Sequence, residues 1–125
     1  KTNPNSKYAK DAKFKLEYLN NYLARKEFEV GMYYLKNNAP SPAINRFSVV
    51  IKDFQGANII PQTLYRMYEA FEMLQLKDKS DQTYLILKYN FPKSKWTKEI
   101  TNKKNKIIEE PGYFKNIMNK MISIF

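Results

Sequence analysis

Apolar residues recur at spacings of three and four along most of this chain, which is the pattern of helices with one apolar face. The first such face consists of Tyr8, Ala12, Leu16, Leu19 and Leu23. No proline interrupts the stretch before Pro40, and Ser6 is suited to cap its start because a serine hydroxyl can accept from a free amide of the first turn. The spacing predicts one long helix from about Ser6 to Lys36. A break near residues 24–26 is the alternative.

Four shorter helices are predicted after this one, separated by turns at prolines, asparagines and a glycine. Ser41 as N-cap and Pro42 as the first helical residue are expected to begin the next helix, which ends at Gln55-Gly56. The others are expected at about Ile60–Leu76, at Ser80–Asn90 after a link at Lys77–Lys79, and from Ser94 to about Glu109. Their expected apolar contacts are Ala43 or Ile44, Phe47, Val50 or Ile51, Phe54, Leu64, Met67 or Tyr68, Phe71, Leu74, Tyr84, Leu87, Phe91, Trp96, Ile100 and Ile107.

Small and aromatic residues repeat at fixed offsets across these helices, as in tetratricopeptide arrays with a period of about 34 residues. A frame begun at Ala24 places Gly31 and Ala43 at small positions and Phe47 at an aromatic one. Restarting the frame at Pro61, a shift of 37 residues, places Tyr84 at the same aromatic position. The pattern predicts an all-α fold, a tetratricopeptide-like solenoid of helical hairpins. Tyr68 at a small position and Glu27 at an aromatic one depart from the template, and an ordinary helical bundle is the alternative.

Both ends of the chain carry further patterns. The phrase Pro4-Asn5-Ser6-Lys7-Tyr8 recurs as Pro92-Lys93-Ser94-Lys95-Trp96, so residues 1–5 resemble the end of a preceding unit and we expect the chain to be cut from something longer. After the helix breaker at 110–112, an apolar stripe with lysines opposite predicts a terminal cap for the solenoid. A basic amphipathic helix on a membrane surface, a partner contact or disorder are the alternatives for this tail. The stripe is Tyr113, Phe114, Ile117, Met118, Met121, Ile122 and Phe125.

The amino-acid composition excludes several classes of function. The 125 residues include neither cysteine nor histidine, so thiol chemistry, disulfides, the usual zinc sites and the commonest general base are excluded. The carboxylates stand among lysines at helical spacings, which is typical of solvated ion pairs, and neither a phosphate loop nor a nucleophile elbow is present. No apolar run reaches the roughly 18 residues that cross a bilayer, so the segment is expected to be soluble. We therefore expect no enzyme, cofactor or metal site.

The formal net charge of +10 suggests nucleic acid as a partner. However, the basic residues are 19 lysines and 3 arginines, and the planar arginine fork is the usual reader of phosphates and bases. The lysines are densest from Lys93 to Lys106, where a solvated helix face is the simplest interpretation. A scaffold surface that holds another protein is the favoured function, and a basic module that binds nucleic acid or a generic peptide-binding repeat protein are the alternatives.

Several segments together resemble the C-terminal half of the BamD family, the tetratricopeptide lipoproteins of the outer-membrane β-barrel assembly machinery. They are 3–12, Leu16-Glu17-Tyr18-Leu19, Leu23-Ala24, 27–34, Ala43-Ile44-Asn45-Arg46-Phe47 and Lys52-Asp53-Phe54. The resemblance covers about residues 1–97, so we divide the chain into repeats at 1–97 and a helical extension or cap at 98–125. The tyrosine pair twelve residues before Asn45-Arg46 is its most distinctive part.

The resemblance implies a lipoprotein at the periplasmic face of the outer membrane of a Gram-negative bacterium. By the same resemblance, we expect the lipid anchor and the half that recognises substrates to be missing from this chain. It also implies docking on the POTRA region of a BamA-like barrel subunit, and it allows contacts with other lipoproteins of the machinery. The family's arginine corresponds to Arg46, a cation suited to a carboxylate on that partner. Asn45, Tyr33 and Tyr34 are expected to support it, although packing between repeats is the stronger interpretation of Tyr34.

Overall fold

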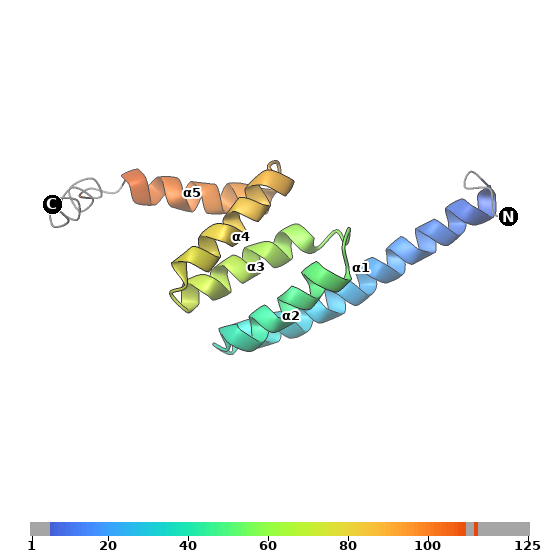
Figure 1. Cartoon of the computed structure of the whole chain (residues 1–125), viewed down its shortest axis with the longest axis horizontal. Helices are drawn as coiled ribbons and strands as arrows, with labels where there is room; N and C mark the ends of the chain where they lie inside the picture. The colour runs from blue at the N-terminus through green and yellow to red at the C-terminus, as the bar shows by residue number, and fades with distance from the viewer. Residues whose placement is uncertain (1–5, 110–111, 113–125) are drawn as a thin grey trace.

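The computed structural model describes residues 6–109 and residue 112, and every regular element in this part of the chain is an α-helix. The helices are α1 (Lys7–Lys36), α2 (Pro40–Asp53), α3 (Ile60–Met73), α4 (Lys77–Asn90) and α5 (Lys95–Glu109). Helix α1 pairs with α2, α3 pairs with α4, α2 packs on α3, and α5 packs on α3 and α4 (Figure 1). The predicted all-α, tetratricopeptide-like fold is confirmed.

Helix α1 is continuous over its 30 residues, so the predicted long helix is confirmed and the break near residues 24–26 does not occur. The Ser6 hydroxyl caps it as expected, accepting from the Ala9 amide at 3.1 Å. Buried residues begin only at Ala24 and continue through Phe28 and Gly31. The second half of α1 is therefore the half that packs on α2.

The two hairpins close through the same backbone turn. Asn38 and Gln75, 37 positions apart, both adopt φ 58°. In the first turn the Ala39 amide donates to the Tyr34 carbonyl at 2.9 Å, and in the second the Leu76 amide donates to the Phe71 carbonyl at 3.0 Å. A left-handed residue followed by such a bond is the Schellman end of a helix. The repeat of 37 residues predicted from side chains thus extends to the hydrogen bonds of the turns.

Two predicted helix starts were wrong. Helix α2 begins at Pro40, and neither its flanking residue Ala39 nor Ser41 makes a side-chain cap. Prolines 40 and 42 both lie in the first turn, where amides have no intrahelical partner, so proline loses nothing there. Helix α4 begins at Lys77 rather than Ser80, because the left-handed turn at Gln75 ends α3 at Met73 and leaves a link of only three residues.

The core lies between the hairpins. Phe47 and Val50 of α2, Leu87 of α4 and Ile100 of α5 have no exposed surface, as the apolar periodicity predicts. The loop between α2 and α3 is fastened to α1 by two asparagines. The Asn20 amide group donates to the Gln55 carbonyl at 3.3 Å, and the Asn21 carbonyl accepts from the Asn58 amide at 2.9 Å.

The first half of α1 projects beyond this core (Figure 1). The apolar face expected there is exposed, with Tyr8 86%, Leu16 67% and Leu19 49% accessible. This face is therefore not packed on any part of the chain that the structure describes. The predictions for residues 1–5 and for the tail 113–125 concern residues outside the described part of the chain. Helix α5 runs through the proposed division at Thr97, and that division stays a prediction.

Candidate functional site

Helix α2 carries the two polar residues singled out by sequence. Its buried stripe is Ala43, Phe47 and Val50, which turns Asn45 and Arg46 away from the core and leaves both exposed. The stripe results from residues spaced three and four apart, so the exposure of its neighbours follows from the same periodicity. Asn45 and Arg46 are accordingly presented on a rigid helix that is packed on both α1 and α3.

The Arg46 guanidinium is held by a carboxylate of the neighbouring helix. Its Nη1 donates to Glu27 Oε2 of α1 at 3.3 Å, with 47% of the arginine side chain and 28% of the glutamate side chain exposed. A pair this exposed stabilises the fold by at most about 1 kcal/mol. This single bond uses only one of the N–H donors of the Arg46 guanidinium. The remaining donors can bind a second carboxylate. Glu27, which departs from the repeat template, thus positions the predicted docking cation.

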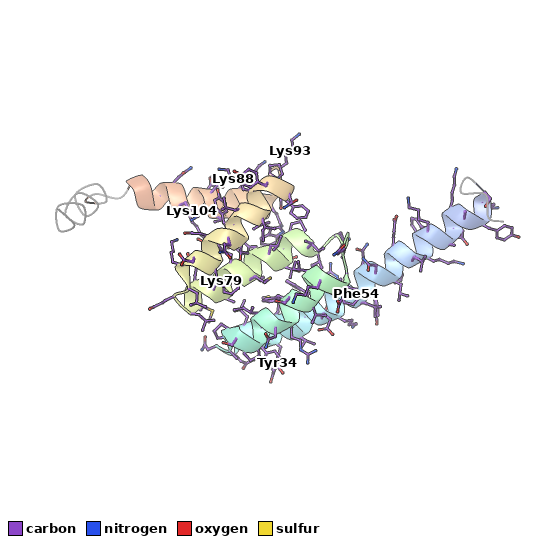
Figure 2. All side chains as sticks on the ribbon, in the orientation of Figure 1. Tyr34, Phe54, Lys79, Lys88, Lys93 and Lys104 are labelled. Atoms are coloured by element: carbon purple, nitrogen blue, oxygen red, sulfur yellow. The ribbon has the colours of Figure 1, made fainter. Side chains whose placement is uncertain are left out.

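Tyr34, Asn45 and Arg46 line one shallow depression of about 390 Å³, together with Pro42 and Val49. Tyr34 is half-buried against the core at the end of the first hairpin, where Figure 2 labels it. Tyr33 does not line the depression. Its ring meets that of Tyr34 edge-on, with centroids 5.7 Å apart and planes at 72°, and the residue is 65% exposed.

The structure therefore brings three of the four candidate residues into one concavity and places the fourth beside it. Tyr34 packs against the core and also lines the depression. Their role in holding a partner stays a prediction.

A larger groove of about 710 Å³ was missed by sequence analysis. It is lined by Met32, Leu35, Lys36, Arg66, Tyr68, Glu69, Glu72, Met73 and Lys103, which come from α1, α3 and α5. Arg66 pairs with Glu69 at 2.6 Å, and its guanidinium lies 5.3 Å from the ring of Tyr65 and 5.7 Å from that of Trp96. The Nε of Arg66 is buried and has no hydrogen-bond partner. The available signal was limited to helical spacing: Met32, Leu35 and Lys36 lie three and four residues apart on α1, and Arg66, Glu69 and Met73 do so on α3.

Helix α5 is attached to the second hairpin by lysines that were expected to be solvated. Lys103 Nζ donates to the Tyr65 hydroxyl at 2.9 Å, and Lys104 Nζ lies 3.3 Å from Asp81 Oδ1 and 5.0 Å from the Tyr84 ring centroid. The interpretation of this helix as a solvated basic face is therefore wrong for Lys104, which is half-buried. Lys103 is exposed as expected, although its ammonium group also reaches the Tyr65 hydroxyl.

The pKa values of three side chains near α5 are shifted by their surroundings. The hydrogen bond with the Tyr65 hydroxyl raises the pKa of Lys103, against the opposing effect of burial. Burial acts to raise the pKa of Asp81, but hydrogen bonds from Lys104 and Lys77 outweigh it and hold that pKa below its usual value. Burial and the neighbouring Glu72 carboxylate raise the pKa of Tyr68. Lys103 and Asp81 thus keep, at neutral pH, the charges that their contacts between α5 and the second hairpin use.

Two further observations bear on the class of site. Across residues 6–109 and 112, no group of three or more acidic side chains converges as metal ligands would. None of the helices described there has the length and apolarity needed to span a bilayer.

Comparison with known proteins found a family and several relatives. The model of the family described as "YfiO: Outer membrane lipoprotein" matches residues 1–87. The chain is 43% identical over 93 residues to the outer membrane protein assembly factor BamD of Rickettsia prowazekii, which is 74% of this chain and 37% of that protein. It is 39% identical over 93 residues to the factor of the same name from Caulobacter vibrioides, 74% of this chain and 30% of that protein.

A third relative, BamD of Neisseria meningitidis serogroup B, is 33% identical over 96 residues, which is 77% of this chain and 36% of that protein. The chain thus spans about a third of the length of each of these relatives. The family match to residues 1–87 falls within residues 1–97, the part for which the sequence shows the resemblance.

Proposed function

Since the chain belongs to the YfiO (BamD) family of outer membrane lipoproteins, we propose that it is a non-enzymatic docking segment of an outer-membrane protein assembly factor. Its place would be the periplasmic face of the outer membrane of a Gram-negative bacterium. Relatives carry the name of assembly factor, and a stack of rigid hairpins is suited to holding another protein rather than to transforming a substrate.

The proposed partner is the POTRA region of a BamA-like barrel subunit, and the proposed contact is the depression at Arg46. The observation that supports it is the convergence of an incompletely used guanidinium with Asn45 and Tyr34 in one concavity. Arginine and tyrosine are the residues most often found to anchor protein interfaces. A partner carboxylate would complete the donor fork of Arg46, with Glu27 fixing its orientation from the other side.

Binding to an isolated POTRA domain tests this proposal. Arg46→Glu is expected to weaken binding by about 1–3 kcal/mol, because a charge-assisted contact is lost. Arg46→Gln should weaken it less. Lys52→Glu is the matched control, since it makes the same charge change at an exposed position of the same helix and should leave affinity unchanged.

Because Arg46→Glu also faces Glu27, the thermal unfolding midpoint of each variant must accompany the affinity. Unchanged affinity for both Arg46 variants would refute the site. Binding that is absent from the unmodified chain as well would refute the partner. For the nucleic-acid alternative, affinity for an oligonucleotide should fall steeply with salt, and a flat response removes it.

A further inference from the structure

The groove of about 710 Å³ lies between α1, α3 and α5, and it is a surface separate from the depression at Arg46. Helix α3 packs on both α1 and α5 and lies between them (Figure 1). The two concavities share no lining residue. Pockets that take drug-sized ligands have volumes of about 300–1,000 Å³, so this groove is large enough to hold a short stretch of another chain.

Part of the groove lining is apolar and accessible. Met32 and Leu35 of α1 and Met73 of α3 belong to it. Met32 and Leu35 are half-buried and pack against the core on their inner side, whereas Met73 is 46% exposed. Methionine side chains are flexible and polarisable, so they adapt to apolar groups of different shapes. This lining can therefore take up apolar side chains of a bound segment.

The charges of the lining are only partly compensated. The two lining carboxylates, Glu69 and Glu72, each belong to an ion pair, at 2.6 Å and 3.7 Å. Among the residues that the structure describes, Lys36 and Lys103 take part in no ion pair, and both are exposed. The Lys103 ammonium group donates to a tyrosine hydroxyl and keeps further N–H donors. The groove therefore presents uncompensated positive charge beside its apolar lining.

We propose that this groove binds a short acidic segment of a partner protein, in which apolar side chains are flanked by carboxylates. The apolar side chains would lie against Met32, Leu35 and Met73, and the carboxylates would pair with Lys36 and Lys103. Five of the nine lining residues are charged, which suits a peptide with its polar backbone better than a lipid acyl chain. The inference does not depend on the partner proposed for the Arg46 depression.

Charge complementarity favours such a partner over the chain itself. A second copy carries a net charge of +10 and would bring further positive charge to the two lysines. The tail 113–125 contains two lysines and no acidic residue, so it has no acidic side chain to pair with them. An acidic segment of another protein supplies the missing charge and is attracted to the groove at low salt.

Selection from a random peptide library displayed on phage, with the full chain as target, tests the proposal. The recovered peptides should combine aspartate or glutamate with apolar residues. One of them that lacks tryptophan is then synthesised, and its affinity is measured by fluorescence anisotropy. The emission of Trp96, the only tryptophan of the chain, reports where it binds. The Trp96 ring lies 5.7 Å from the guanidinium of Arg66, a lining residue, so a peptide in the groove should change this emission.

Charge reversal tests the polar part of the site. Lys36→Glu combined with Lys103→Glu should lower the affinity at least about tenfold, because each exposed charge pair is worth up to about fivefold and both become repulsive. Lys36→Glu alone leaves the contacts of α5 intact and should lower it about fivefold. The matched control combines Lys52→Glu with Lys98→Glu, exposed positions of α2 and α5 outside the groove, and should change affinity by less than about twofold.

Replacing an apolar lining residue tests the other part. Met73→Gln should lower the affinity at least about threefold, because an apolar contact is lost at similar side-chain size. Leu85→Gln is its control, since Leu85 is 45% exposed but lies on α4 outside the groove, and it should leave the affinity unchanged.

Equal losses for the variants and their controls would overturn the proposal, as would the recovery of basic peptides or of none. Binding that appears only after residues 113–125 are removed would assign the groove to the chain's own tail. Dimerisation that Met73→Gln abolishes would assign it to a second copy. Either result would refute a partner segment. Arg46→Glu should leave the peptide affinity unchanged, so a failure here and a failure of the POTRA site can be told apart.

Discussion

Replacing Gly31 with alanine is expected to destabilise this protein, although alanine is the better helix former by about 1 kcal/mol. A Cβ added at Gly31 would lie 2.6 Å from Cδ1 and 3.1 Å from Cζ of Phe47, and closer still to Cε1. The Phe47 ring has no exposed surface and packs on Phe28 with centroids 5.6 Å apart, so it cannot swing aside without disturbing the core.

Overpacking of this kind costs typically about 1–3 kcal/mol. Because the contact involves a fully buried ring, the cost should exceed the gain in helix propensity and leave a net loss of about 1 kcal/mol. In a domain of this size such a loss lowers the unfolding midpoint by roughly 3–6 °C. Thermal unfolding followed by far-ultraviolet circular dichroism measures it directly.

A double-mutant cycle with Phe47→Leu tests the cause. The smaller side chain should leave room for the new methyl group, so the combined variant should be less destabilised than the sum of the single changes, by about 1 kcal/mol. An unfolding midpoint raised by Gly31→Ala, or strictly additive effects, would show that the two helices do not approach each other as closely as described.

Two further outcomes are expected from particular contacts. Gln75→Gly should stabilise the protein by roughly 1 kcal/mol, because glycine removes the cost of a left-handed residue at φ 58°. Gln75→Ala should bring no such gain, since alanine carries the same cost. Denaturant unfolding measures the stability of both variants. Asp81→Asn should destabilise the protein near neutral pH by at most about 1 kcal/mol, because ion pairs this exposed contribute little. The pKa of Asp81 is lowered in the folded protein, so its contribution is complete above the ordinary value of about 3.9 and is lost as the pH falls through the lower folded pKa. The stability gap between the two proteins should therefore close in acid, and a constant gap would contradict the pairing.

Much of the fold could be predicted because local signals and the global repeat agree. The stripe Ala43, Phe47 and Val50 is buried as its spacing predicts, and Gly31 sits where two helices must meet. Helix starts were predicted less well. Ser41 has the chemistry of a cap, but the helix already begins at Pro40, where a missing N–H costs nothing. The left-handed turn at Gln75 cannot be recognised from a glutamine.

The candidate site, like the fold, could be predicted only in part. The exposure of Asn45 and Arg46 follows from the period of one helix, whereas the ion pair with Glu27 depends on how α1 and α2 cross. The groove could not be assembled from sequence, because its lining comes from three helices that are distant along the chain. The contacts of Lys103 and Lys104 could not be predicted for a related reason: which side of α5 meets the aromatic rings is decided by the packing of that helix and not by its composition.

Only the second half of α1 is packed on the rest of the protein, and this determines where the cooperatively unfolding unit begins. From Asn20 onward the helix is held by side-chain hydrogen bonds and core packing, while the thirteen residues from Lys7 to Leu19 are helical only as an extension of that held part. An isolated helix of that length is marginal in water. Its amides should exchange with solvent far faster than those of Ala24 to Leu35, and a protease should trim the chain back toward Asn20 while the hairpins stay intact.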